Sequence, residues 1–193
     1  MTSATPDFFV SPPEIVTERL LLRGLHPDDA PAIFEYCSRD NVTKYVVFPT
    51  HQSVTDSEAF IDRATNGKPL EFGVVWAIVL RDSGKLIGTI GIHKINLEQD
   101  KLETGYALHD DYWNKGYTTE ALRALIGEIF TKTSINRIEA LHAEEHTASG
   151  AVMQKSGMSY EGTLREASVT KGKRWNMKVF SILKREWEAS KDR

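Results

Sequence analysis

The spacing of hydrophobic residues along this chain predicts alternating strands and helices. Apolar runs of the strand type occupy Arg19–Arg23, Val74–Leu80, Leu86–Ile92, Leu102–Leu108, Arg137–Ala143, Ser159–Thr170 and Trp175–Leu183. Helical spacing follows the turn at residues 26–29 as far as Cys37, and recurs over residues 53–66, 117–132 and 147–155. The order is therefore strand, two helices, three strands, helix, strand, helix and two strands. This mixed order predicts one α/β sandwich built on a mostly antiparallel sheet.

Polar turns mark the connections between these elements. Arg81–Lys85 separates two strand-like runs and predicts a hairpin, and Lys171–Lys173 predicts a second one. The start of the chain is rich in Thr, Ser and Pro, so we expect residues 1–16 to be a flexible lead-in. Residues 17–188 should then form a single domain, followed by a C-terminal tail at 189–193.

Composition narrows the classes of function. Of the 193 residues, 40% are hydrophobic and 26% are charged, as in a globular domain with a substantial core. The net charge of −3 argues against a general binder of nucleic acid or acidic membranes. Cys37 is the only cysteine, which excludes an intrachain disulfide and favours a buried structural thiol. No apolar run has the length of a membrane span and residues 1–13 lack a signal-peptide pattern, so the expected compartment is the cytoplasm.

The segment Tyr112–Leu122 carries the strongest sign of chemistry. It follows a predicted strand, places Gly116 at the crossing, and enters a helix with an apolar face. Glycine there lets the backbone approach a ligand, and the first helical N–H groups are free to bind an anion. Lys115 adds a positive charge. The segment predicts a cradle for a phosphate or pyrophosphate; an ordinary strand–turn–helix with a packing glycine is the alternative.

Three segments together resemble the GCN5-related N-acetyltransferase (GNAT) superfamily, and within it the Rim-type ribosomal-protein-alanine N-acetyltransferases. They are Thr17–Arg23, Tyr112–Leu122, and Thr147–Ser149 with Lys155–Met158. The similarity extends over nearly the whole chain, from residue 17 to 187. It implies acetyl-CoA as co-substrate and a mixed, mostly antiparallel sheet of about seven strands with helices on both faces. It also implies that the fourth and fifth strands splay apart.

The chain departs from the family pattern at several positions. Trp113 stands where the superfamily's loop motif opens with Arg or Gln, and His146 stands where an asparagine usually contacts the cofactor arm. Met153 occupies the position of a tyrosine that can protonate the leaving thiolate. Asp110 replaces a common proline and Met158 a common phenylalanine, and both resemble packing changes.

The resemblance assigns the cofactor contacts. The pyrophosphate is expected on the cradle, through Trp113, Asn114, Lys115, Gly116, Tyr117, Thr118 and Thr119. Gly105 lies inside a strand and suggests a bulge, with a packing glycine as the alternative. The pantetheine arm would pair with the backbone of Tyr106, Ala107 and Leu108. The N–H of Leu108 would polarise the thioester carbonyl and receive the developing oxyanion.

Fewer side chains are candidates for catalysis than for cofactor binding. An attacking amine must be neutral, and Glu103 is the candidate proton acceptor, through water or by attracting a cationic substrate. A solvated strand carboxylate is the alternative. Ser149 is the candidate partner of the CoA sulfur because Met153 cannot donate a proton; it can equally bond local backbone. His146 would contact the pantetheine arm or lie in an exposed loop.

The sequence leaves two alternatives to acetyl transfer. Residues 142–146 match the H-x-x-E-H pattern of zinc peptidases, which requires both histidines to converge on one metal. A strand that runs into His142 and a helix that starts at Thr147 predict that the histidines diverge, so we predict no metal. A non-catalytic acyl-CoA-binding or protein-interaction module is the other alternative, because the leaving-group tyrosine is absent.

The acceptor is the least defined part of the hypothesis. The Rim-type resemblance implies the N-terminal amine of a protein, such as a ribosomal protein, attacked directly in a ternary complex. Related members acetylate amino acids, polyamines or drug amines, and residues 43–70 carry no decisive signature. We expect no nucleic-acid or membrane partner, and a homodimer would be consistent with the family.

Overall fold

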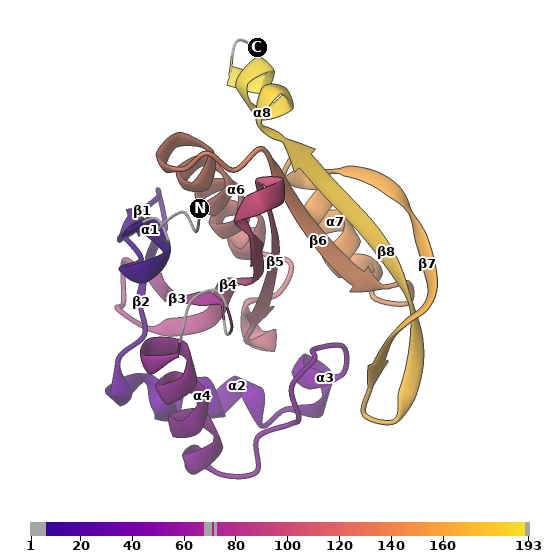
Figure 1. Ribbon diagram of the computed structural model, residues 1–193. Coiled ribbons are helices and arrows are strands. Elements are labelled where there is room, and N and C mark those ends of the chain that lie inside the picture. The colour runs from indigo at the N-terminus through magenta and orange to yellow at the C-terminus, as the bar shows by residue number, and fades with distance from the viewer. Residues whose placement is uncertain (1–6, 68–70, 72, 192–193) are drawn as a thin grey trace.

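The computed structural model describes residues 7–67, 71 and 73–191. Its centre is an eight-stranded sheet in the order β1-β2-β3-β4-β5-β6-β8-β7 (Figure 1). Neighbouring strands are antiparallel except β5 and β6, which are parallel. The strands are β1 Ile15–Val16, β2 Leu20–Gly24, β3 Val74–Leu80, β4 Leu86–Asn96, β5 Lys101–Leu108, β6 Arg137–Ala143, β7 Ser159–Thr170 and β8 Lys173–Leu183.

Helices cover both faces of the sheet, as the sequence predicts. One hydrophobic core includes residues of α6 and α7, and a second core on the other side includes residues of α2 and α4. Among the described residues, no helix combines the length and hydrophobicity of a transmembrane span. The helices are α1 Asp7–Val10, α2 Ala30–Cys37, α3 Asp40–Thr43, α4 Val54–Asn66, α6 Tyr117–Lys132, α7 Thr147–Lys155 and α8 Lys184–Lys191, with short 3-10 turns η1 Pro27–Asp29, η2 Leu97–Gln99 and η3 Asp110–Tyr112.

The start of the chain is more ordered than the expected flexible lead-in. Phe8 and Phe9 are buried, and the Phe8 ring lies 6.0 Å from that of Trp76. The Trp76 indole N–H donates to the carbonyl of Pro13 at 2.9 Å. Ile15 adds β1 to the sheet edge. Residues 7–16 therefore pack on the domain because their apolar side chains cover β3, while residues 1–6 lie outside the described residues.

The end of the chain also differs from a plain tail. The expected tail began at residue 189, whereas α8 continues to Lys191. Trp187 of this helix lies 5.5 Å from the ring of Phe130 on α6. The aromatic contact fixes α8 against the domain. Residues 192 and 193 of the expected tail lie outside the described residues.

The parallel strands β5 and β6 separate part-way along their length. They pair only from Lys101 with Arg137 to Thr104 with Ala140. Beyond this point β5 keeps its pairing with β4, and β6 keeps its pairing with β8. The two strands diverge in Figure 1 and leave a gap between their carboxyl ends. The splayed strand pair is thus present, one number later than predicted because β1 adds a strand.

The predicted bulge at Gly105 is wrong. Gly105 pairs in register with Gly91, and the irregularity lies on β4, where His93 is inserted between Ile92 and Lys94. A Cβ atom on Gly105 would lie 2.4 Å from the Nε2 atom of His93. Gly105 therefore has the alternative role, that of a packing glycine, because only a residue without a side chain leaves room for the imidazole.

The β7–β8 hairpin reaches across the molecule to the segment after α3 (Figure 1). Lys171 and Gly172 in its turn have φ angles of 51° and 75°, the left-handed pair that tight hairpins require. The Lys171 ammonium donates to the Thr43 carbonyl and to the Thr50 hydroxyl, both at 2.9 Å. These bonds connect the hairpin to the α2–α4 side of the gap.

Candidate active site

The predicted cradle is a left-handed turn followed directly by a helix. Asn114 and Gly116 have φ angles of 60° and 81°, and α6 begins at Tyr117. The first bond of the helix runs from the Glu120 N–H to the Gly116 carbonyl at 3.0 Å. The N–H groups of residues 117–119 precede this bond and have no intrahelical partner. They form a cluster of donors at the positive end of the α6 dipole, which suits an anion.

Basic side chains that the sequence did not single out surround this cradle. A hollow of about 660 Å³ beside it is lined by Thr17, Glu18, Arg19, Gly116, Thr119, Glu120, Arg123 and Lys155. The Arg19 guanidinium lies 4.5 Å from the centre of the Tyr117 ring and donates to the Lys115 carbonyl at 3.0 Å. Arg123 donates through Nε to the Lys155 carbonyl at 3.0 Å. Three cations, from the residue before β2, from α6 and from α7, thus line one hollow, in which the Glu120 carboxylate accepts from Arg19 at 2.6 Å.

Along β5, the backbone N–H and C=O groups of every second residue point toward the gap. The His109 N–H donates to the Ile87 carbonyl of β4 at 2.8 Å, which fixes the alternation of the antiparallel ladder. By this alternation Ala107 bonds to β4, whereas Tyr106 and Leu108 face the gap. The backbone polar groups of Ala107 are therefore used within the sheet, and those of Tyr106 and Leu108 are the groups of this segment that face the gap.

Trp113 fixes the end of this open edge. Its indole N–H donates to the Leu108 carbonyl at 2.8 Å, and its side chain is partly exposed beside the cradle. The Leu108 carbonyl is therefore occupied, which leaves the Leu108 N–H as the donor that faces the gap. Trp113 thus positions the strand from which that N–H projects.

Across the gap, the side chain of Tyr106 meets α7. The Tyr106 hydroxyl donates to the Ser149 carbonyl at 3.0 Å and lies 3.0 Å from the Ser149 hydroxyl. Burial raises the pKa of Tyr106, so the phenol keeps its proton. Met153 is buried in the core beneath. Sequence reasoning considered Tyr106 only for its backbone, and no sequence signal linked residues 106 and 149.

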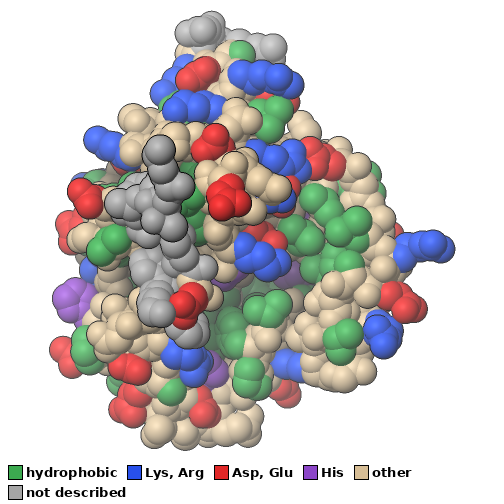
Figure 2. Space-filling model, viewed as in Figure 1, with side chains coloured by type: hydrophobic (Ala, Val, Ile, Leu, Met, Phe, Trp, Pro, Cys, Tyr) green, Lys and Arg blue, Asp and Glu red, His purple; other side chains and the backbone are tan. Residues whose placement is uncertain are grey.

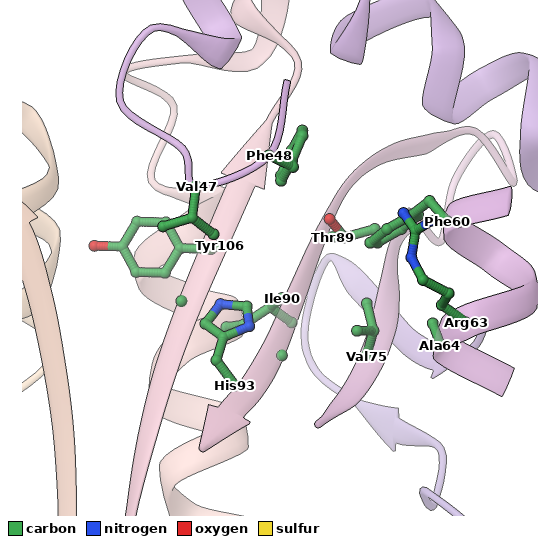
Figure 3. Close-up of a pocket in the computed structure, with 12 residues that line it drawn as sticks. Val47, Phe48, Phe60, Arg63, Ala64, Val75, Thr89, Ile90, His93 and Tyr106 are labelled. Atoms are coloured by element: carbon green, nitrogen blue, oxygen red, sulfur yellow. The ribbon is translucent and has the colours of Figure 1, made fainter. Parts of the chain in front are cut away.

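A second hollow lies on the α2–α4 side of the sheet, next to the same strand (Figure 3). Its volume is about 180 Å³. On the face shown in Figure 2, hydrophobic side chains gather around a depression below the centre. We call this hollow the acceptor pocket. It is lined by Val47, Phe48, Phe60, Arg63, Ala64, Val75, Thr89, Ile90, Gly91, His93, Gly105 and Tyr106.

The sequence of this chain matches a known family. Residues 19–159 match the family model described as an acetyltransferase (GNAT) domain. The chain belongs to the GNAT acetyltransferase family.

Individual relatives agree with this assignment. The chain is 33% identical over 177 residues to the "Uncharacterized N-acetyltransferase p20" of Bacillus licheniformis, covering 90% of this chain and 97% of that protein. It is 28% identical over 184 residues to YdaF of Bacillus subtilis, and the match covers 91% of this chain and 97% of YdaF. The name of YdaF assigns it provisionally as a ribosomal N-acetyltransferase. A crystal structure of a GNAT-family acetyltransferase from Bacillus anthracis is similar with a TM-score of 0.81 and 29% identity, covering 90% of this chain and 99% of that one.

In this acetyltransferase, Glu103 lies beside the acceptor pocket rather than in its lining. Its carboxylate accepts from the Lys94 ammonium at 2.8 Å. The Lys94 side chain is 76% exposed, and that of Glu103 is 22% exposed. Glu103 therefore places a partly neutralised negative charge two residues before Gly105, the first residue of β5 in the pocket lining.

The zinc-peptidase pattern does not assemble in this acetyltransferase. His142 lies on β6, where its Nδ1 donates to the Ala143 carbonyl at 2.7 Å. Glu145 accepts from Lys173 at 3.2 Å. The His146 ring stacks on Tyr45 with centroids 4.5 Å apart, and burial lowers its pKa to about 4, so it is neutral. His142 and His146 thus contact different groups, and among the described residues neither belongs to a cluster of three or more potential metal ligands.

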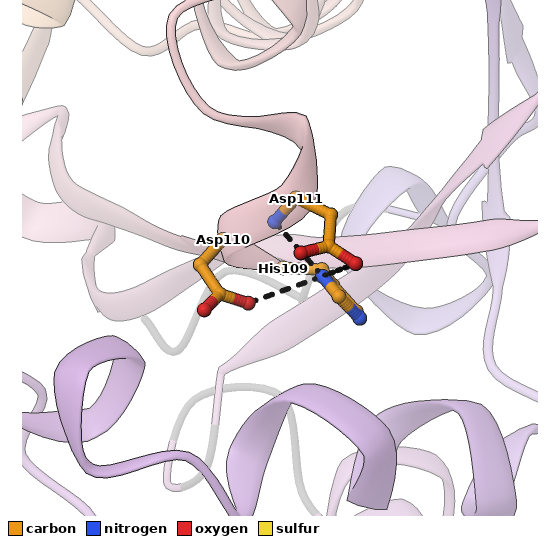
Figure 4. A group of neighbouring side chains, drawn as sticks. All are labelled: His109, Asp110 and Asp111. Atoms are coloured by element: carbon orange, nitrogen blue, oxygen red, sulfur yellow. Dashed lines mark hydrogen bonds and ion pairs between the residues drawn. The ribbon is translucent and has the colours of Figure 1, made fainter.

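One group of three side chains is compact enough for an ion, His109, Asp110 and Asp111 (Figure 4). The Asp111 N–H donates to His109 Nδ1 at 3.1 Å. Arg39 and Asn41 donate to the Asp110 carboxylate at 2.5 and 2.8 Å. The replacement of the common proline by Asp110 thus ties η3 to the segment around α3, and these bonds account for the cluster.

Cys37 has the structural role that the sequence suggested. It is buried in the core beneath α2 and α4. Burial raises the pKa of its thiol to about 12, so the reactive thiolate is scarce at neutral pH.

Proposed function

We propose that this enzyme transfers the acetyl group of acetyl-CoA to a primary amine by direct attack in a ternary complex. The observation that carries the proposal is the gap between β5 and β6. Beyond the end of this pairing, β5 leads from the acceptor pocket, whose lining includes Gly105 and Tyr106, toward the amide cradle at the start of α6. A donor thioester laid in the gap would expose its carbonyl to an amine that enters from the pocket.

The donor contacts follow from the free backbone groups. The N–H groups of residues 117–119 would bind the pyrophosphate, and Arg19, Arg123 and Lys155 would add positive charge around the phosphates. The backbone of Tyr106 and Leu108 would pair with the pantetheine arm. The Leu108 N–H would donate to the thioester oxygen and stabilise the negative charge that develops there.

The pocket lining favours an acceptor with an apolar group next to its amine. Val47, Phe48, Phe60 and other apolar side chains make up most of the wall, and Arg63 is the cationic member. No carboxylate belongs to the lining among the described residues, so the second ammonium of a polyamine would meet no negative charge on the pocket wall. The N-terminal residue of a protein meets these requirements, and the provisional assignment of YdaF supports it. The small volume also suits a free apolar amine.

The leaving thiolate requires a hydrogen-bond donor, because Met153 cannot supply one. We assign this role to the paired hydroxyl groups of Ser149 and Tyr106, which lie where α7 borders the gap. A CoA thiol resembles a free thiol, with a pKa of roughly 8.5, so its anion leaves readily once a hydrogen bond is available. Glu103 contributes negative charge that attracts the ammonium form of the acceptor.

The experiment measures CoA release and the acetylated product with three acceptors. The purified enzyme is mixed with acetyl-CoA and, in separate reactions, a peptide that begins with alanine, phenethylamine or spermidine. We expect one thiol released per acetylated amine, with the peptide or phenethylamine preferred. Acetyl-CoA binding without transfer to any amine would favour the non-catalytic module, and preference for spermidine would contradict the acceptor assignment.

A further inference from the structure

The acceptor pocket contains a basic side chain that sequence reasoning missed, His93. It is the residue inserted into β4 between the partners of Thr104 and Glu103. Figure 3 shows its ring turned toward Tyr106 and Val47, within the pocket lining. The irregularity in β4 therefore brings an imidazole to the end of the pocket that borders β5.

The backbone of Gly105 is what admits this ring. A Cβ atom at Gly105 would lie 2.4 Å from Nε2 and 2.8 Å from Cδ2 of His93, both well inside contact distance. Gly105 immediately precedes Tyr106, whose backbone faces the gap. The imidazole thus lies against the strand segment on which the proposed thioester would rest. The Glu103 carboxylate, by contrast, is paired with Lys94.

The ring is available for proton transfer. Among the described residues, neither ring nitrogen of His93 has a hydrogen-bond partner. His93 is an exposed residue, so its ring is open to solvent and to an incoming amine. Desolvation by the neighbouring protein atoms lowers the pKa of His93 from its ordinary value; Lys94 acts in the same direction and Glu103 opposes it. Arg63 is the further charged side chain of the pocket lining. At neutral pH the ring is therefore uncharged, with one lone pair free to accept a proton.

We propose that His93 is the proton acceptor for the attacking amine. This inference rests on the proposed acetyl transfer. The amine nitrogen bonds to the thioester carbonyl carbon, the carbon–sulfur bond breaks with its electron pair on sulfur, and the proton on nitrogen passes to His93. A hydroxyl of the Ser149–Tyr106 pair donates a hydrogen bond to the thiolate, which takes its proton from water, and His93 returns its proton to that water. After the ammonium form of the acceptor has lost one proton to solvent, the balance is one neutral amine and one thioester converted to one amide and one thiol.

The test compares His93→Ala and His93→Gln with the wild type, using whichever of the alanine-first peptide and phenethylamine the wild type acetylates faster. We expect kcat to fall by about 10²-fold or more in both variants, with acetyl-CoA binding unchanged. Added imidazole should restore part of the rate to His93→Ala and none to the bulkier His93→Gln. The kcat of the wild type should fall at acidic pH, with an apparent pKa below that of an ordinary histidine. This fall should be absent from both variants. The exposed His26→Ala variant is the control that should retain full activity.

A second variant separates proton transfer from folding. Gly105→Ala should displace the His93 ring and reduce kcat, yet cost little more in the His93→Ala background, because the two changes remove one interaction. The role of His93 would be overturned if the kcat losses of Gly105→Ala and His93→Ala multiplied in the double variant. It would also be overturned if His93→Ala kept the wild-type kcat and pH profile. Either result would leave acetyl transfer intact. A wild-type enzyme that acetylates no amine would overturn both.

Discussion

Replacing Gly116 tests whether the cradle binds the donor. Gly116 has a φ angle of 81°, so any side chain there is strained by about 1–2 kcal/mol. The nearest atom to an added Cβ is the flexible end of Arg19 at 3.4 Å, so Gly116→Val should still fold. The added methyl groups would, however, occupy the approach of a pyrophosphate to the amides. Loss of one or two charge-assisted hydrogen bonds costs about 3 kcal/mol, or roughly a hundredfold in affinity.

The assay is thermal unfolding with and without acetyl-CoA. At a concentration of about 100 times the wild-type Kd, the ligand stabilises the folded state by about 2.7 kcal/mol, which raises Tm by roughly 5–10 °C for a chain of this size. A hundredfold weaker variant gains only about 0.4 kcal/mol, or roughly 1 °C. Gly172→Val is the matched control, because Gly172 is also left-handed, at 75°, with nothing within 4 Å of an added Cβ. Equal ligand-induced shifts in both variants would refute the cradle.

Three further predictions concern other parts of the molecule. Ser149→Ala and Tyr106→Phe should each lower turnover by about tenfold, the scale of one hydrogen bond. The double variant should lose less than the product of the two single losses, and a thousandfold loss in a folded single variant would contradict a shared role. Glu103→Gln should mainly raise the KM for a cationic acceptor. An unchanged KM would mean that Glu103 is a solvated strand carboxylate with no part in acceptor binding. Hydrogen bonds from Arg137 and Ser181 lower the pKa of Glu161 from 4.5 to about 2, so its stabilisation is present above pH 4.5 and is lost as pH falls toward 2. Denaturant titrations should therefore show the stability of wild type and Glu161→Gln converging over that range, and a constant difference would exclude this linkage.

The regular elements could be predicted because their hydrophobic periods are long. The strands at 74–80 and 137–143 and the helices at 117–132 and 147–155 have the bounds that the pattern indicates. The sequence pattern missed α1, α3, β1 and α8, which are short and owe their order to tertiary contacts. Phe8 and Phe9, for example, pack on a strand more than sixty positions away in the chain.

The site was predictable only where backbone geometry follows from local sequence. Gly116 marks the cradle because a left-handed turn before a helix needs glycine, and the splayed strands followed from the family resemblance. Gly105 was misjudged because its reason lies on another strand, in the ring of His93. The pairing of Tyr106 with Ser149 likewise joins residues 43 positions apart. Such side-chain contacts depend on the assembled sheet and leave no periodic signal in the sequence.

A crystal structure of the enzyme with acetyl-CoA would test the central claim most directly, because the claim concerns where the donor lies. It should place the pyrophosphate on the N–H groups of residues 117–119 and the pantetheine arm between β5 and β6. The thioester oxygen should accept from the Leu108 N–H within hydrogen-bond distance, with the acetyl carbon open to the acceptor pocket. Acetyl-CoA bound outside the gap, or in the gap with its acetyl group turned away from that pocket, would contradict the account.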